Sequence, residues 1–399
     1  MSFRASIKKV HLWLGLSSGL VVFILGVTGA LFVFHQEITQ WPRYDLRHAD
    51  VVKSRTLPLS QLHDRLAQVM GVKRLRYGIT SFRDPARNWQ AVTFRRGEDN
   101  WTYFGSIKDY RTGYINPYTG RVAGIVNEEQ DFFQIVKGIH WSLLLAEPIG
   151  QPIVACSALI FSVMLLSGLI LWWPRRWNRS GRQGRFRTNC KAPWKRLNID
   201  LHRVLGFYAL VVLLVIGFTG LYWYFPFVQK TFYFLGTGDF TLPESAPSRV
   251  ANASPASQTD GETPLAKAYA IAWSRFPEAD AITFTLPGAD GKTIEAQVQP
   301  AEGRYDQPSV LLFDSQSGRL VKQRLYSEMN AGEKLLAMNY DLHVGSIGGL
   351  CTKLLVFVAG LIAAGLPVTG FLYWYPTWKH KRRSRQQRKS AIAEGPAGY

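Results

Sequence analysis

Four long apolar stretches constrain this sequence more than any other feature. Each is nearly free of charge, and about 20 residues at 1.5 Å rise per residue are enough to cross a hydrocarbon core about 30 Å thick. The sequence therefore predicts a membrane α-helical protein with a four-helix transmembrane bundle. The four stretches are residues 10–34, 153–173, 204–225 and 350–374.

The distribution of charge predicts the orientation in the membrane. The formal net charge is +19, and nearly all of it lies in three short segments, 4–9, 175–203 and 379–389. The two long polar segments between the spans are together nearly neutral. Because basic residues mark cytoplasmic loops, both termini and the middle loop are expected to be cytoplasmic. The same distribution argues against a nucleic-acid partner, which needs a basic patch on a folded domain.

Neither a signal peptide nor cysteine chemistry is indicated. The first apolar stretch exceeds the 7–15 residues or so of a signal core, and no Ala-x-Ala-like site follows Phe34, so it is expected to remain as an anchor. The chain has three cysteines, and none lies in the two long polar segments, so no disulfide is expected there. No CxxCH motif occurs, which excludes the usual covalent attachment of haem.

The chain also repeats itself. Residues from His11 to Gly29 match residues from His202 to Gly220 in order and spacing, and His140 before the second span matches His343 before the fourth. The predicted unit is helix, outer domain, helix, occurring twice in tandem. Because each unit contains two spans, both copies enter the membrane in the same direction, which implies a pseudo-two-fold axis along the membrane normal.

Each outer domain is expected to be a mixed α/β domain. The first shows an amphipathic helix from Leu59 to Val69, strands at 89–95 and 101–107 and an Asn-Pro-Tyr-Thr-Gly turn at 116–120. The second shows a helix at 264–276 and strands at 281–286, 293–298 and 310–313. The expected division is 1–35 for the N-terminus and first helix, 36–138 for the first periplasmic domain, 139–174 for the second helix with its lead-in, 175–202 for the basic loop, 203–226 for the third helix, 227–341 for the second periplasmic domain, 342–376 for the fourth helix with its lead-in, and 377–399 for the basic tail.

Five histidines lie at helix ends or beside them. His11 and His202 begin the first and third helices, His140 and His343 precede the second and fourth, and His35 closes the first. An interfacial contact with headgroups would explain any one of them. An ionisable group at membrane depth is nevertheless a functional hypothesis. Four histidines that the repeat superposes in pairs have the arrangement that bis-histidine haem ligation needs.

Small residues accompany these histidines. Gly15 and Gly206 each follow a histidine by four residues and lie on its helical face, where they would admit a flat macrocycle or allow close helix packing. A Ser-Gly or Thr-Gly pair also occurs in every span, and helix packing accounts for it. These pairs are Thr28-Gly29, Ser167-Gly168, Thr219-Gly220 and Thr369-Gly370. No Walker loop, strand-linked GxGxxG or HExxH motif is present.

Taken together, these motifs resemble the PepSY-associated transmembrane family over about residues 5–380. The resemblance is carried by His11-x-Trp13-x-Gly15, the Thr-Gly close of the first helix, the Asn-Pro-Tyr-Thr-Gly-Arg turn and the tandem arrangement. The family includes iron-regulated bacterial inner-membrane proteins, some of them ferric-siderophore reductases. It implies PepSY-like periplasmic domains and a core that binds haem b. The ligands to the haem iron carried over by position are His11, His202, His140 and His343, with His35 as a spare.

The function that follows is that of a membrane oxidoreductase, a ferric-chelate reductase. Electrons would pass from a quinol or a cytoplasmic reductase, through haem, to a ferric siderophore, because reduction to Fe(II) weakens binding by hard oxygen ligands. Two levels of histidine indicate two haems, and the pairs related by the repeat are favoured over pairs that include His35. The alternatives are a regulatory or binding module and an accessory subunit of a siderophore permease, both without redox activity. The sequence singles out no catalytic residue, and membrane lipid is the remaining expected partner.

Overall fold

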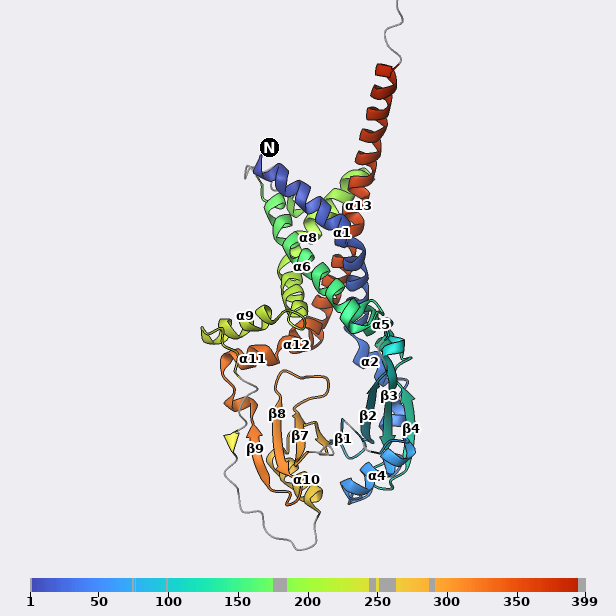
Figure 1. Cartoon of the computed structure of the whole chain (residues 1–399), viewed down its shortest axis with the longest axis vertical. Coiled ribbons are helices and arrows are strands. Elements are labelled where there is room, and N and C mark those ends of the chain that lie inside the picture. The colour runs from blue at the N-terminus through green and yellow to red at the C-terminus, as the bar shows by residue number, and fades with distance from the viewer. Residues whose placement is uncertain are drawn as a thin grey trace, which may run out of the picture.

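The computed structural model describes residues 2–73, 75, 77–97, 100–174, 185–243, 249–250, 263–286 and 291–393. It consists of a helical bundle at one end and a β-sheet with two covering helices at the other (Figure 1). Several short helices lie where these two parts meet. The part of the predicted basic loop at 175–184 and the last six residues of the predicted tail lie outside the described residues.

In the part of the chain that the structure describes, four helices form the bundle: α1 (Phe3–Phe32), α6 (Glu147–Trp172), α8 (Trp194–Leu221) and α13 (Gly349–Ala393). All four contain segments long and apolar enough to cross a membrane, which confirms the four predicted spans. In α13 that segment ends at Pro376, but the helix continues to Ala393 and projects beyond the bundle (Figure 1). The predicted basic tail is therefore helical over most of its length.

Small residues bring the bundle helices close together. A Cβ added to Gly26 of α1 would lie 2.6 Å from the backbone nitrogen of Ala364 in α13, and one added to Gly360 would lie 3.1 Å from the Cβ of Ala30. Only glycine permits such an approach, which is how helices gain van der Waals contact in a membrane. Leu165 and Leu213 pack in the centre of the bundle between α6, α8 and α13.

Within the described residues, nine strands form one antiparallel sheet in the order β4-β3-β2-β1-β6-β7-β8-β9-β5. The two central strands come from different halves of the chain, because β1 pairs with β6 from Ile79↔Phe284 to Phe82↔Ala281. The two polar segments, expected as separate domains, therefore share one sheet. The strands are β1 (Ile79–Phe82), β2 (Trp89–Arg96), β3 (Ile107–Ile115), β4 (Val122–Asn127), β5 (Arg249–Val250), β6 (Ala281–Thr285), β7 (Thr293–Gln299), β8 (Ser309–Asp314) and β9 (Leu320–Arg324).

Two amphipathic helices cover one face of this sheet. Leu62 and Leu66 of α4 (Leu59–Val69) and Ala268 of α10 (Pro264–Arg275) are fully buried in one core with Phe284 of β6. Burial of this apolar surface from both halves is the main stabilisation of the sheet. Val69, the last residue of the predicted amphipathic helix, is exposed.

The seam between the halves is closed by polar contacts as well. The hydroxyl oxygens of Thr80 and Thr283 lie 2.8 Å apart across β1 and β6. Arg47 and Arg87 of the first half form ion pairs with Glu302 of the second. Burial acts to raise the pKa of Glu302, but the two arginines outweigh it and lower that pKa.

The short elements connect bundle and sheet. They are α2 (His35–Gln40), α3 (Tyr44–Arg47), α5 (Phe132–Ser142), α9 (Pro226–Thr237), α11 (Ala331–Ala337) and α12 (Asn339–Val344), with 3-10 turns η1 (Phe104–Ser106), η2 (Tyr326–Glu328) and η3 (Ser346–Gly348).

Most predicted elements of the sheet region are confirmed, and one is wrong. The Asn-Pro-Tyr-Thr-Gly turn joins β3 and β4, with Gly120 at φ +68° and its N–H donating to the Asn116 carbonyl at 2.9 Å. Residues 101–106 do not form a strand, and β3 begins only at Ile107. The side chain of Asn100 accepts hydrogen bonds from the amide and hydroxyl of Thr102, which favours a turn over a ladder.

Candidate functional site

The four repeat-related histidines meet in two pairs. The rings of His11 on α1 and His202 on α8 have centroids 6.5 Å apart. The rings of His140 on α5 and His343 on α12 have centroids 6.1 Å apart. The first is called the distal pair, because it lies at the end of the bundle away from the sheet, and the second the sheet-side pair. The structure thus brings together the partners that the sequence favoured.

The two pairs lie at different depths. His140 contacts Thr28, which is on the same helix as His11, and His343 contacts Thr219, which is on the same helix as His202. His11 and Thr28 on α1, like His202 and Thr219 on α8, are separated along the helix by about 25 Å at 1.5 Å rise per residue. This separation is close to the thickness of a hydrocarbon core, which is about 30 Å.

A hydroxyl group from a neighbouring helix binds Nδ1 of every one of these histidines. The hydroxyls belong to the Ser-Gly and Thr-Gly pairs of the spans, which the sequence analysis attributed to packing. The N···O distances are 2.8 Å for His11 and Ser167, 2.9 Å for His202 and Thr369, 3.0 Å for His140 and Thr28, and 3.0 Å for His343 and Thr219.

These hydroxyls determine which ring nitrogen carries the proton. The Thr28 and Thr219 hydroxyls each donate to the backbone carbonyl four residues earlier, at 2.7 Å. A hydroxyl has one proton, so its oxygen is left to accept from Nδ1–H. Nδ1 of His343 also lies 3.1 Å from the carbonyl oxygen of Ile216, which can only accept. The Ser167 and Thr369 hydroxyls likewise donate to backbone carbonyls of their own helices, at 3.0 and 2.8 Å. All four imidazoles therefore present Nε2 with a free lone pair, the form that binds a metal.

The glycine of each pair makes room for the ring itself. A Cβ on Gly29 would lie 3.1 Å from Cε1 of His140, and one on Gly220 would lie 3.2 Å from Cε1 of His343. At Gly168 and Gly370 the corresponding distance to the distal histidines is 3.5 Å. Each histidine is thus seated between a hydroxyl and a glycine.

Two buried asparagines also belong to the site, and the sequence analysis missed them. The Nδ2 atom of Asn198 donates to the Thr369 carbonyl at 2.9 Å, and that of Asn339 donates to the Thr219 carbonyl at 3.3 Å. Each asparagine precedes a paired histidine by four residues on the same helical face. Their Oδ1 atoms are buried and have no partner in the described part of the chain. A comparison of depth between neighbouring spans could have identified both the hydroxyls and the asparagines.

The other predicted residues lie apart from the rings. His35, the first residue of α2, hydrogen-bonds through Nδ1 to the Phe32 carbonyl at 2.8 Å and stacks on the Phe32 ring at the end of α1. A Cβ on Gly15 would meet Met164 at 3.0 Å, and one on Gly206 would meet Leu366 at 3.3 Å. Side chains of the facing helices occupy these positions, so the two glycines serve helix packing here.

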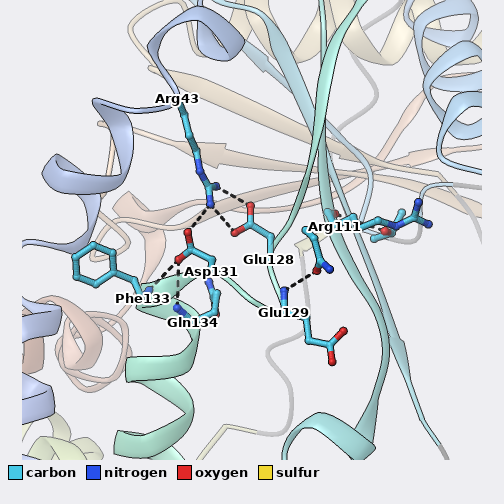
Figure 2. A network of polar contacts seen from close by, with 9 residues as sticks. Arg43, Arg111, Glu128, Glu129, Asp131, Phe133 and Gln134 are labelled. Atoms are coloured by element: carbon cyan, nitrogen blue, oxygen red, sulfur yellow. Dashed lines mark hydrogen bonds and ion pairs between the residues drawn. The ribbon is translucent and has the colours of Figure 1, made fainter.

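A charged network holds the helix that carries His140. Asp131 caps α5 by accepting from the amide of Phe133 at 2.9 Å (Figure 2). Arg43, from the segment between α2 and α3, reaches across to Asp131 at 2.8 Å and to Glu128 at 2.7 Å (Figure 2). Burial of Arg43 acts to lower its pKa, but Glu128 outweighs it, so the pKa is raised and the charge is retained.

A carboxylate also holds in place the helix that carries His343. Asp341 of α12 is fully buried and accepts from the backbone amide of Tyr305 at 2.8 Å. It also accepts from the hydroxyl of Ser346. Tyr305 lies between β7 and β8, so both helices of the sheet-side pair are tied by carboxylates to chain segments next to the sheet.

The donor set fits haem better than a bare metal ion. Within the described residues, no three His, Cys, Asp or Glu side chains gather to hold a metal ion. Haem would supply most of the ligands to its iron itself, so two histidines would be enough to hold it. Two imidazoles bound to one metal at about 2 Å each would have centroids roughly 6 Å apart, as both pairs do. An apolar cleft of about 270 Å³ also borders His202, lined by Leu205, Val358 and Leu361 among others.

Comparison with known proteins addresses the family directly. The model of the PepSY-associated transmembrane region matches residues 8–376, which is nearly the whole chain. No curated protein matches the sequence. In sequence, the match covers the four apolar helices and the strands that form the sheet. This membrane protein therefore belongs to the PepSY-associated transmembrane region family.

Proposed function

We propose that this protein is a haem-containing oxidoreductase of the bacterial inner membrane that reduces a ferric siderophore on the periplasmic side. The observation that carries the proposal is the pair of histidines at each end of the bundle, with Nδ1 occupied by a hydroxyl and Nε2 free. One structural histidine would need no such arrangement. Four of them, held in the same way, are what two bis-histidine haem b groups require.

The chain's own residues would supply position and a dry environment. His11 and His202 would hold one haem, and His140 and His343 the other. Haem, when bound, supplies one-electron chemistry. Ser167, Thr28, Thr219 and Thr369 would keep the Nδ1 protons in place and set the ring orientation, which raises the basicity of the ligand nitrogen. The surrounding apolar helices would exclude water from the path between the two pairs.

The direction of electron transfer follows from the proposed topology. Basic residues in the middle loop and the tail favour a cytoplasmic location for both termini, which would put the sheet in the periplasm. A quinol or a cytoplasmic reductase would then deliver electrons near the distal pair. A ferric siderophore would gain one electron per iron near the sheet-side pair. The recurring contacts of His11 with His202, and of His140 with His343, also support the tandem repeat.

An absorbance spectrum of the detergent-purified protein, before and after dithionite, tests the proposal. We expect a Soret band with sharp reduced α and β bands and close to two haems per chain. Reduction with dithionite and then addition of a ferric siderophore should reoxidise the protein and release Fe(II) to a ferrous chelator. A colourless protein from haem-replete cells would contradict the proposal and favour the binding or permease-accessory alternatives, which a pull-down from membranes would separate.

A further inference from the structure

Helix α9 carries an unusual apolar surface at the end of the bundle. Phe227, Phe234 and Leu235 are 53%, 37% and 70% exposed. Phe234 stacks on Phe240, at 4.2 Å between ring centroids. Phe234 and Leu235 follow Phe227 by seven and eight residues, the i, i+7, i+8 spacing of one helical face. Surfaces in contact with water rarely expose a contiguous apolar patch of this kind, so we expect this face of α9 to bind a partner.

The opposite face of α9 is already occupied. A Cβ on Gly236 would lie 2.4 Å from the backbone nitrogen of Gly332 in α11, and Tyr233 is buried against the same helix. The Asn330 side chain donates to the Tyr233 hydroxyl at 3.2 Å. With about 100° of rotation per residue, the aromatic face points away from α11.

The arrangement of the elements shows where that face points. α9 begins five residues after α8 ends and lies crosswise to it, and α11 lies on the side of α9 that is nearer the sheet (Figure 1). The face opposite α11 is therefore turned toward the level of the membrane spans. Lys230 is exposed at the edge of this face, where its ammonium group can reach lipid phosphates.

We propose that α9 lies in the membrane interface, with Phe227, Phe234 and Leu235 inserted into the lipid and Lys230 at the headgroups. The partner is the bilayer itself, because α9 closely follows the candidate span α8, and Trp223 and Tyr224 of the connection are 37% and 40% exposed. The patch also has the mixture of aromatic residues and lysine typical of interfacial helices. The inference is independent of haem. It adds a lateral anchor to the four spans and limits how far the sheet can tilt relative to the membrane.

Site-directed spin labelling tests this placement. Cys156, Cys190 and Cys351 are first replaced by serine, and a nitroxide is attached at L235C or F234C in protein reconstituted into phosphatidylethanolamine–phosphatidylglycerol vesicles. Matched labels at V211C, on the 70% exposed lipid-facing side of α8, and at S317C, in the exposed turn between β8 and β9, calibrate lipid and water.

We expect the α9 labels to be accessible to oxygen, as at position 211, and to be several-fold less accessible to a water-soluble nickel reagent than the label at position 317. Nickel accessibility equal to that at position 317 would overturn the proposal, because the face would then be in water. Protection from both reagents would also overturn it and would indicate cover by protein, such as a second copy of the chain. If L235C alters the elution of the purified protein, F227C supplies the same measurement on the same face.

Discussion

At the scale of single residues, the chemistry of an imidazole depends on which nitrogen keeps its proton. In this protein the proton position is set by hydroxyls whose own proton is already donated to a backbone carbonyl. The Thr219 proton is committed to the Val215 carbonyl at 2.7 Å, so the threonine oxygen accepts from His343. The same logic applies to Thr28 and His140. The Thr-Gly pairs, which were predicted to serve helix packing, therefore also orient the histidines so that Nε2 is left without a proton.

The first prediction at this scale concerns the ligands. H202A should reduce haem from about two to about one per chain, because the distal pair loses an axial ligand. H35A is the matched control and should keep both haems, since His35 is engaged by Phe32. A pyridine haemochrome assay on purified protein measures the ratio. Full haem content in H202A, or loss in H35A, would refute the assignment.

The second prediction concerns a hydroxyl. S167A removes the hydrogen-bond acceptor of His11 Nδ1 and should weaken haem binding by 10–100-fold, roughly the effect of losing such a partner at other metal sites. It should also change the reduction potential of one haem only. S162A removes a hydroxyl from the same helix that instead donates to the Ala158 carbonyl, and we expect it to leave both properties unchanged. Potentiometric titration followed at the α band provides both measurements, and equal effects of the two variants would contradict the role of Ser167.

At the scale of elements, the two pairs are supported differently. His11 and His202 belong to the long helices α1 and α8. His140 and His343 belong to the short helices α5 and α12, of 11 and 6 residues. Isolated helices of this length are marginal, so α5 and α12 depend on the Arg43 network and on Asp341. Movement of the sheet should therefore affect the sheet-side pair first.

The third prediction follows from that dependence. R43M leaves Glu128 and Asp131 without their cation, and breaking a buried pair of this kind costs about 3–5 kcal/mol. Arg43 and Glu128 are 13% and 7% exposed, so solvent offers little compensation. We expect a lower thermal unfolding temperature and partial loss of the sheet-side haem, with the distal haem retained.

A matched surface pair serves as the control for R43M. Arg83 and Glu278 are 53% and 91% exposed, and R83M should cost no more than about 1 kcal/mol. Thermal denaturation followed by circular dichroism and by the Soret band compares the two variants. Similar losses in both, or loss of the distal haem first in R43M, would count against the anchoring role of Arg43.

At the scale of the whole molecule, the halves of the chain are joined twice, once in the bundle and once in the sheet. α1 packs on α13 through Gly26 and Gly360, and β1 pairs with β6. The sheet core contains Leu62 from the first half and Phe284 from the second. Neither half of the sheet region can therefore bury its apolar face alone, and the two should unfold together.

The fourth prediction tests the join in the sheet. In a background without the native cysteines, T80C and T283C should form a disulfide spontaneously on oxidation, because the two hydroxyls are 2.8 Å apart on paired strands. T80C with T293C is the control, since Thr293 lies on β7 and pairs with Asp314 instead. Mobility on a non-reducing gel after proteolysis between the halves reports the cross-link. A cross-link that forms equally in both variants, or in neither, would contradict the continuous sheet.

The sequence alone determined the four spans, because hydrophobicity over about 20 residues is a local property that every membrane helix must have. It also determined most strands, the turn at Asn116 and the four paired histidines, since their spacing and repetition are visible in one dimension. The strand predicted at 101–107 was wrong up to residue 106, because the local hydrogen bonds of Asn100 outweighed the strand-like composition of this segment.

Only the tertiary structure decided how these parts meet. The contacts of Ser167 with His11 and of Thr28 with His140 depend on which helices are neighbours and at what depth, which spacing along one helix does not encode. The pairing of β1 with β6 likewise depends on two distant segments burying their apolar faces together. Burial rewards whichever surfaces come into contact in three dimensions, so the partners of each residue emerge only when the whole chain has packed.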